Sequence, residues 1–375
     1  MDWNERTAAA IADLDLGALG DRLRGAGAYL VGGAARSIAS GRVPDRDVDI
    51  AVEADLDPLL EGLESAGDAR RHQRFGTATV PLPDGRHADL ARTRRETYES
   101  PGALPAVEPA SIREDLERRD FTVNAIAIAI DPPHAVVDPF DGAADLEAGR
   151  LRVLHAGSFL DDPTRAIRGA RYCARLGLQP DEATLALLSQ ADLSSVSADR
   201  RRAELGRLAA EEEAAAGFAL LDSWGALKIA PQDLELLAAV DTVASGDPGL
   251  WAPETRAAGI VLAAEGGGAA DTARELADAE PARPSAAVEL AAGASEPILL
   301  AALAAGAGWV ERYVREWRHV RLEIGGEDLI EAGHRPGPAI GAGLDGALTL
   351  KLDGELDGGR EAELAAALRI AGEPI

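Results

Sequence analysis

The segment LVGGAARSIASGRVPDRDVDIAV, residues 30–52, decides the fold of the amino-terminal part of the chain. It begins as an apolar strand that ends in Gly32 and Gly33 and runs into a predicted helix. Backbone N–H groups at such a junction have no Cβ in the way, so they can bind a phosphate at the helix N-terminus. The glycine pair therefore predicts a site for the phosphates of a nucleotide.

Two aspartates follow the glycines in the same segment. Asp47 and Asp49 flank Val48 in a predicted strand, whose period of two puts both carboxylates on one face and Val48 in the core. Neighbouring carboxylates repel each other unless a cation lies between them, and Mg²⁺ is held by a few carboxylates together with substrate phosphates. Solvated aspartates at a strand end are the alternative, which the glycine pair makes the weaker interpretation. The segment thus predicts a magnesium site beside a phosphate site.

The chain divides into an α/β part and a helical part. Between residues 28 and 91 four β-rich runs, AYLVGG, RDVDIAV, TATVPL and RHADLAR, alternate with turns and with one predicted helix, DPLLEGLESAG. From Ser158 onward the pattern is almost wholly helical. We therefore expect an α+β protein with a mixed-sheet head at 1–153, a helical neck at 154–230 and a helical body and tail at 231–375.

The charge of the chain is uneven. The 375 residues include 38 basic and 64 acidic side chains, for a net charge of −26. This average alone would disfavour nucleic acid as a partner. Between residues 165 and 207, however, arginines outnumber acidic residues, whereas 208–310 is strongly acidic. A basic strip on an acidic body remains compatible with RNA binding.

Composition also bears on location. We find no run of eighteen apolar residues, so no membrane span is expected. The first twenty residues lack the basic stretch of a secretory signal, and we expect a cytoplasmic protein. The single cysteine, Cys173, lies in the apolar helical run RYCARLG and is predicted to be a small core residue.

Residues 30–49 resemble the first motif, roughly LVGGxVRDxLLGxxxxDxD, of the class II tRNA nucleotidyltransferases. These are the CCA-adding enzymes and bacterial poly(A) polymerases of the polymerase β superfamily. The resemblance continues in HADLARTRRETY, EDLERRDFTVNAIAI, DPFDGAADLEAGRLR and FLDDPTRAIRGARYCARLG, and in the tail segment LEIGGEDLIEAGHRPGPAIGAGL. The motifs cover residues 28–229 and 321–356. They identify the chain as similar to this family over most of its length.

The resemblance implies a polymerase β-like head and an enzyme that adds CTP and ATP to the 3′ end of tRNA. The RNA 3′-OH would attack the nucleotide α-phosphate, assisted by two Mg²⁺ ions. The implied catalytic and metal residues are Asp47, Asp49 and Asp89. The implied nucleotide-binding residues are Gly32, Gly33, Arg36, Arg119, Asp120, Asn124, Asp161, Asp162, Arg165 and Arg168. RNA binding is expected at Arg171, Arg175, Arg200, Arg201 and Arg202.

Several of these positions make physical sense by themselves. Ser111 and Glu114 form a predicted capping box that opens a helix. Asp120 and Asn124, spaced i, i+4, are expected on one face of that helix. The arginines of DDPTRAIRGARYCAR are spaced so that all four lie within about 120° of one helix face. Carboxylates and guanidiniums on such a face can pair with the Watson–Crick edges of cytosine and adenine.

Two positions depart from the family pattern. Ser37 stands where the family has Asp, and Asp161 replaces the Glu of its EDxxR motif. Addition of A alone or CC alone, and poly(A) tailing, remain alternatives within the class. A non-catalytic RNA-binding paralogue and a small-molecule nucleotidyltransferase are weaker alternatives. No histidine lies next to an aspartate, so no phosphohydrolase site is expected, and the sequence does not determine the oligomeric state.

Overall fold

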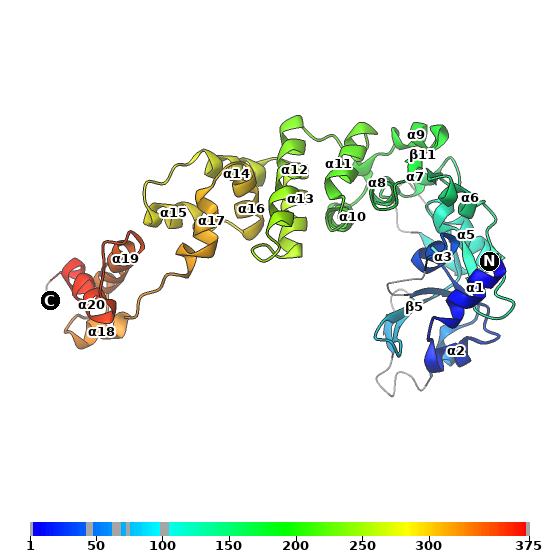
Figure 1. The fold of residues 1–375 in the computed structure, drawn as a ribbon, viewed down its shortest axis with the longest axis horizontal. Helices are drawn as coiled ribbons and strands as arrows, with labels where there is room; N and C mark the ends of the chain where they lie inside the picture. Colours follow the sequence, from blue (N-terminus) through cyan, green and yellow to red (C-terminus); the bar gives the residue numbers. More distant parts are fainter. Residues whose placement is uncertain (1–2, 43–47, 62–68, 73–75, 98–104, 373–375) are drawn as a thin grey trace. The chain divides into compact units, whose positions relative to one another are not determined.

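The computed structural model describes residues 3–42, 48–61, 69–72, 76–97 and 105–372. The chain forms two compact units, divided between Lys228 and Ile229 (Figure 1). The predicted head and neck both belong to the first unit except for the last two residues of the neck. The division of head from neck at residue 153 stays a prediction.

A seven-stranded mixed sheet forms the centre of the first unit, which confirms the expected α+β head. The strand order is β3-β4-β5-β2-β1-β8-β9, with β2 and β5 parallel and the other neighbours antiparallel. The strands are β1 Ala28–Leu30, β2 Val48–Val52, β3 Arg70–His72, β4 Thr77–Pro81, β5 His87–Arg92, β8 Ala127–Ala129 and β9 Val136–Val137. The sequence patterns predicted four of these strands and missed β3, β8 and β9, which are only two or three residues long.

The two faces of the sheet are covered differently. Val48, Ile50 and Val52 of β2 are buried on one face, with helices α1 Trp3–Ala12, α2 Gly17–Leu23, α3 Gly32–Ala39 and α4 Leu56–Leu60 contributing to the same core. Ala51 points to the other face, where α5 Ile112–Glu117 covers it. Asp49 shares that second face by the period of two but is exposed. Its carboxylate is therefore accessible on the face of the sheet opposite to Val48 and Ile50.

The helix predicted over 57–67 is confirmed only in its first turn. Asp55 caps α4 by accepting a hydrogen bond from the backbone N–H of Asp57, and the described helix ends at Leu60. Residues 62–68 lie outside the described part of the chain. The remaining short elements of the head are the hairpin of β6 Arg94–Thr97 and β7 Ala106–Pro109, the 3₁₀ turn η1 Thr122–Asn124, and α6 Gly142–Glu147.

The predicted neck is helical, as expected. Its elements are α7 Ser158–Asp161, α8 Arg165–Leu176, α9 Glu182–Leu188, η2 Leu193–Ser195, α10 Ala198–Ala209 and α11 Ala214–Ser223. A short neck strand, β11 Gln179–Pro180, pairs in parallel with β10 Arg150–Leu151 at the end of the predicted head. Gly169 lets α8 approach the head closely, because a Cβ there would lie 3.0 Å from the ring of Phe121. Cys173 is buried in α8, which confirms its predicted core position, and burial raises the pKa of its thiol to about 12.

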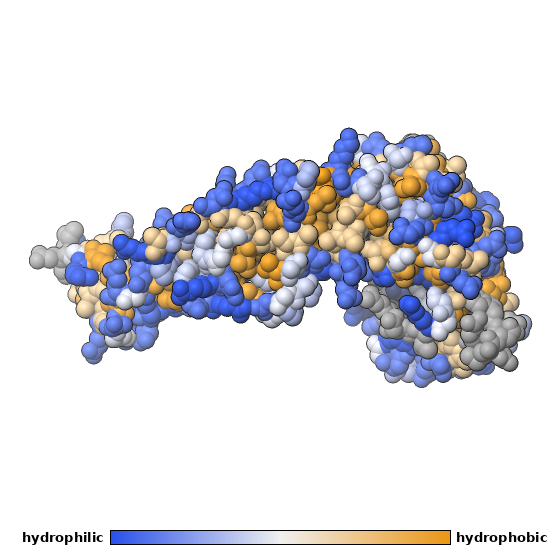
Figure 2. All heavy atoms as spheres, turned by 45° about the horizontal axis from the view of Figure 1, so that its top comes forward, coloured by the Kyte–Doolittle hydropathy of each residue, from blue (hydrophilic) through white to orange (hydrophobic). Residues whose placement is uncertain are grey.

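The second unit is built from helices. They are α12 Pro231–Gly246, α13 Pro253–Glu265, α14 Gly268–Asp278, α15 Pro284–Ala291, α16 Glu296–Ala304, α17 Trp309–Arg315, η3 Trp317–His319, α18 Gly326–Glu331, α19 Pro338–Leu352 and α20 Gly359–Ala371. Leu329, Ala347 and Ala367 form the centre of a separate small core among α18, α19 and α20. Figure 2 shows hydrophilic side chains interspersed with apolar ones over the surface. Among the described residues, every helix is too short or too polar to cross a lipid bilayer.

Candidate nucleotide-binding and catalytic site

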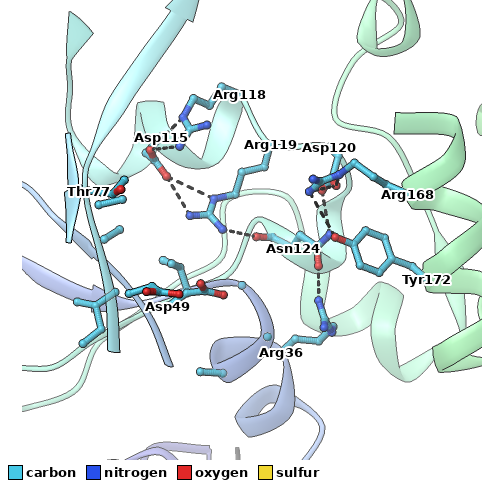
Figure 3. Close-up of a pocket in the computed structure, with 18 of the residues that line it drawn as sticks. Arg36, Asp49, Thr77, Asp115, Arg118, Arg119, Asp120, Asn124, Arg168 and Tyr172 are labelled. Carbon is cyan, nitrogen blue, oxygen red and sulfur yellow. Dashed lines mark hydrogen bonds and ion pairs between the residues drawn. The ribbon is translucent and has the colours of Figure 1, made fainter. Parts of the chain in front are cut away.

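A cavity of about 1210 Å³ opens in the first unit between strands β2, β4 and β5 of the sheet and helices α3, α5 and α8 (Figure 3). Most of the residues that the sequence singled out meet there, although the most distant of them, Gly32 and Arg200, are 168 residues apart in the chain. The predicted site residues that line the cavity are Gly32, Gly33, Arg36, Asp49, Asp89, Arg119, Asp120, Asn124, Asp162, Arg165, Arg168, Arg171, Arg175 and Arg200. The position of Asp47 lies outside the described residues.

Two carboxylates stand side by side on the floor of the cavity. Asp49 and Asp89 are directly paired in the parallel register of β2 and β5. The hydroxyl of Thr79 donates a hydrogen bond of 2.6 Å to Asp89 Oδ1. Enclosure by the cavity walls raises the pKa of Asp49; Arg119 counteracts this shift, and the negative charge of Asp89 adds to it. The Asp49 carboxylate is therefore held in a place that disfavours its charge when no cation is near.

Gly32 allows the start of α3 to approach this carboxylate. Its φ of +60° is in the left-handed region, and a Cβ at this residue would lie 2.7 Å from Asp49 Oδ2. The backbone N–H of the next residue, Gly33, acts to lower the pKa of Asp49. Any side chain at position 32 would be strained and would also collide with the carboxylate. The glycine pair thus brings the N-terminus of α3 close to the carboxylates of β2 and β5.

The donor set fits a divalent cation bound together with phosphate. Hard divalent ions prefer carboxylate oxygens, and a cation would relieve the repulsion between Asp49 and Asp89. The described residues contain no cluster of three or more His, Cys, Asp or Glu side chains able to hold a metal ion. Substrate oxygens, water or residues beyond the described ranges would have to complete the coordination.

Asp115 holds the arginines that follow it. Its buried carboxylate accepts hydrogen bonds from Arg118 at 2.7 Å and from Arg119 at 3.0 Å, and the backbone N–H of Arg94 also donates to it. Arg119 further donates to the carbonyl oxygen of Asn124 at 3.2 Å. Sequence reasoning missed both Asp115 and Arg118 as parts of the site. The i, i+3 and i, i+4 spacing in EDLERR was the signal that could have found them.

Asp120 and Asn124 contact each other, but the expected shared helix face is wrong. Helix α5 begins with the predicted capping box of Ser111 and Glu114 and ends at Glu117. Asp120 follows this end and accepts a hydrogen bond from the backbone N–H of Phe121, while Asn124 lies in the 3₁₀ turn η1. Such local side-chain bonds compete with helix continuation. The Asn124 amide still donates to Asp120 Oδ1 at 2.9 Å.

Arg168 pairs with Asp120 from the facing helix α8. The Asp120 side chain is buried, and its Oδ2 accepts a hydrogen bond from Arg168 Nε at 2.7 Å. Burial alone would raise the pKa of Asp120, yet Arg168, Asn124 and Arg165 together lower it to about 2. The arginine responds in the opposite sense, since Asp120 raises the pKa of Arg168. The pair is thus fully ionised at neutral pH and fixes the approach of α8 to the head residues.

The predicted base-reading residues are only partly brought together. Arg165 is 5% exposed and donates to Ser158 Oγ at 2.8 Å and to the carbonyl of Arg118 at 2.9 Å. Asp162 accepts from Thr164 and, at 3.2 Å, from Arg200. Arg165 and Asp162 both line the cavity. Asp161 does not; it lies 3.6 Å from the His155 ring, so its predicted nucleotide contact stays a prediction.

The four arginines of α8 share the cavity side of the helix, as their spacing predicted. Arg171 and Arg175 both approach Glu211, at 3.4 Å and 3.5 Å. Tyr172, which the sequence reading left without a role, is buried among them and also lines the cavity. The predicted RNA-binding residues Arg201 and Arg202 lie on α10 outside the cavity lining, and their role stays a prediction.

Comparison with known proteins supports the same interpretation of the fold. Residues 28–152 match the poly(A) polymerase head domain. The CC-adding tRNA nucleotidyltransferase of Deinococcus radiodurans is 34% identical over 92% of this chain and 90% of its own length. The A-adding tRNA nucleotidyltransferase of Geobacter sulfurreducens is 31% identical over 95% of this chain, and the chain spans about half, 46%, of its length.

Solved structures extend the similarity to nearly the whole chain. A CCA-adding enzyme in complex with CTP superposes with a TM-score of 0.75 at 26% identity and covers 97% of both chains. The Thermotoga maritima CCA-adding enzyme complexed with tRNA superposes with a TM-score of 0.71 at 25% identity, over 96% of this chain and 97% of that one.

The mixed sheet, the glycine turn at Asp49 and the arginine-rich helix α8 define a nucleotidyltransferase with a polymerase β-like head. Similarity to the Deinococcus radiodurans enzyme over nearly its full length is more specific than the fold. This chain belongs to the family of the class II CCA-adding tRNA nucleotidyltransferases.

Proposed function

We propose that this protein adds nucleotides from CTP and ATP to the 3′ end of tRNA. The observation that carries the proposal is the meeting of Asp49, Asp89 and the start of α3 in one cavity with the arginines of α8. An RNA 3′-OH would attack the α-phosphate of the nucleotide, forming a new phosphodiester bond and releasing pyrophosphate. The carboxylates Asp49 and Asp89 suit the metal ions of this reaction, and the arginines of α8 suit the negatively charged phosphates of the nucleotide and the RNA.

The head residues would bind the triphosphate and ribose. The open N–H groups at the start of α3 suit phosphate oxygens. Arg119 uses three of its five N–H donors on Asp115 and Asn124 within the described residues, which leaves two for a ligand in the cavity. Because Asp115 fixes this guanidinium, little side-chain entropy is lost when a phosphate binds. Asp120 and Asn124 would then orient the sugar.

Asp49 and Asp89, with Asp47, would hold Mg²⁺. When bound, the ions would lower the pKa of the attacking hydroxyl and neutralise charge on the phosphates. The chain's own contribution is to keep the carboxylates in register on neighbouring strands, with Thr79 fixing Asp89. This arrangement supports the two-metal proposal made from the sequence.

Asp162, Arg165 and Arg168 would select the base from the neck side of the cavity. A carboxylate accepts from the amino groups of cytosine and adenine, and a guanidinium donates to their ring acceptors. Arg165 keeps N–H donors beyond its bonds to Ser158 and Arg118. The basic residues Arg171, Arg175, Arg200, Arg201 and Arg202 would bind the RNA backbone, although Arg200 must then share its charge with Asp162.

Addition of CC alone is the second candidate. The relative from Deinococcus radiodurans, which the chain covers almost completely, is a CC-adding enzyme, whereas the A-adding relative from Geobacter sulfurreducens is about twice as long as this chain. The two outcomes differ in the last step only. A protein of the second kind would stop after two cytidines even when ATP is supplied.

One assay tests both candidates. The purified protein is incubated with Mg²⁺ and tRNAs that end before C, after C and after CC, with each nucleotide supplied separately, and the products are sized. Full activity extends all three substrates in the order C, C, A. If only the first two tRNAs are extended, the protein is a CC-adding enzyme. Long runs of A on any RNA identify a poly(A) polymerase. The absence of extension on every substrate would contradict the proposed function.

A further inference from the structure

Five side chains form a closed ring of contacts on the α8 wall of the cavity (Figure 3). Arg36 of α3 donates to the amide oxygen of Asn124, and the Asn124 amide donates to Asp120. Asp120 accepts from Arg168, whose Nη2 lies 3.4 Å from the hydroxyl of Tyr172. The ring closes because the Arg36 guanidinium stands over the aromatic ring of Tyr172, 5.5 Å from its centroid. Three separate segments of the first unit are thereby tied together.

Tyr172 is the member around which positive charge gathers. Besides Arg36, the guanidinium carbons of Arg171 and Arg175 lie 5.0 Å and 5.6 Å from the centroid of its ring. The ring itself is fixed from the core, where Phe121 meets it edge to face at 6.0 Å. Tyr172 is only 6% exposed. An anchored aromatic ring therefore presents its π-system to three cations.

The side chains around Tyr172 carry more positive charge than the acidic groups they contact carry negative charge. Arg171 and Arg175 approach the same oxygen of Glu211, and Arg36 donates to a neutral amide. Burial lowers the pKa of Arg36, and the charges of Arg175 and Arg171 act in the same direction. Guanidiniums repel each other, so holding them on one wall needs a compensating attraction. The negative face of an aromatic ring supplies it.

We propose that Tyr172 is a positioning residue whose ring keeps Arg36, Arg171 and Arg175 together on one wall of the cavity, where they bind a phosphate group. The hydroxyl has a separate task, because it contacts Arg168 and through it Asp120. Phosphate is the matching chemistry, since its oxygens accept several guanidinium hydrogen bonds at once. Under the proposed function, on which this step rests, that phosphate belongs to the nucleotide or to the RNA backbone.

The two tasks of Tyr172 can be separated experimentally. Tyr172→Phe removes the hydroxyl and keeps the ring. Incorporation of pentafluorophenylalanine at position 172 also keeps the ring shape but removes the negative potential of its face. Tyr313→Phe, in α17 of the second unit, is the matched control. For each full-length variant we would measure equilibrium affinity for CTP with Mg²⁺ and for tRNA that lacks its terminal CCA, and confirm folding by thermal unfolding.

We expect Tyr172→Phe to weaken CTP binding about 3- to 10-fold, within the range for one ordinary hydrogen bond, and to leave tRNA affinity unchanged. The fluorinated variant should bind one phosphate ligand about tenfold more weakly than Tyr172→Phe does. If only the affinity for tRNA falls, the arginines bind the RNA backbone. If only the affinity for CTP falls, they bind the triphosphate. Equal affinities of these two variants for both ligands would overturn the proposal.

A further variant covers the case in which the fluorinated chain does not fold. Arg36→Gln removes one of the three cations without altering the ring, and it should weaken binding of the same phosphate ligand. Unchanged affinity for both CTP and tRNA would contradict the proposal. Failure of the proposed function is recognised separately, because it would show as a wild-type chain that binds CTP and tRNA yet extends no tRNA. In that case the affinity comparison still decides the role of Tyr172.

Discussion

Arg168 Nη2 and Asp120 Oδ2 lie 2.7 Å apart, one on the neck helix α8 and the other in the segment that follows α5. The pair joins two sequence motifs 48 residues apart. Asp120 also accepts from Asn124, and Arg168 also contacts Tyr172. The residues proposed to orient a nucleotide are therefore fixed before any ligand arrives, which reduces the entropy lost on binding.

Asp120→Asn should destabilise the first unit by about 2 kcal/mol. Removing one partner of a fully buried ion pair costs about 3 to 5 kcal/mol, and the loss should be smaller here because Arg168 is 36% exposed in its side chain. Urea unfolding monitored by circular dichroism measures the change. Asp271→Asn is the control, because it breaks an ion pair with Arg274 in which the Asp271 side chain is 63% exposed. Its free energy of unfolding should stay within about 0.5 kcal/mol of the wild type.

The same ion pair predicts an acid-dependent stability. The folded protein lowers the pKa of Asp120 from its usual 3.8 to about 2. Stability from the ionised carboxylate is therefore complete above about pH 4 and is lost as the pH falls toward 2. The urea midpoint of the wild type should fall across that window, more steeply than that of Asp120→Asn. Parallel curves for the two proteins would show that Asp120 does not carry the effect.

Asp49→Ala and Asp89→Ala should abolish nucleotide incorporation without loss of stability. Both carboxylates are exposed in the cavity, and the pKa of Asp49 is raised, so its charge does not favour the folded state. We expect incorporation to fall by at least about 10³-fold, as expected when electrostatic stabilisation of the reacting phosphate is lost. Chelation of divalent ions should reduce the wild type to the same level. Retained incorporation in a folded Asp49→Ala protein would contradict the metal assignment.

Gly32→Ala should impair catalysis beyond the cost of its backbone strain. Gly32 and Gly76 have nearly the same positive φ, +60° and +59°, but only at Gly32 would a Cβ meet another group, Asp49 Oδ2 at 2.7 Å. Both alanine variants should lose about 1 to 2 kcal/mol of stability for the left-handed backbone. Only Gly32→Ala should also lose nucleotide incorporation. Similar activity in the two variants would mean that the approach to Asp49 is not needed.

Arg165→Ala should reduce base selection more than triphosphate binding. A good bidentate contact discriminates between bases by about 1 to 3 kcal/mol, so misincorporation of UTP and GTP should rise by about five- to 150-fold. The measurement supplies all four nucleotides singly to a tRNA substrate. If Arg165 only braces α8 through Ser158 and the Arg118 carbonyl, the variant loses stability and keeps its selectivity.

Local pattern predicted much of the fold and the floor of the site. The alternation in RDVDIAV placed Val48 in the core and Asp49 on the opposite face, because side-chain direction in a strand follows from the backbone alone. The glycine pair predicted the turn into α3 for the same kind of reason. The cavity side of α8 followed from helical spacing, which needs no knowledge of the rest of the chain.

Contacts between segments far apart in the chain were decided only by the tertiary structure. The sequence predicted that Asp162 and Arg165 both read the base. It did not indicate that Asp162 contacts Arg200 or that Arg165 reaches Ser158 and Arg118. It also left Tyr172 without a role, because the arginines around its ring include Arg36, which is 136 residues earlier in the chain. An arginine has several N–H donors, and the distance and burial of the available acceptors determine which of them it contacts. The packing of α3, α5 and α8 fixes these distances and this burial.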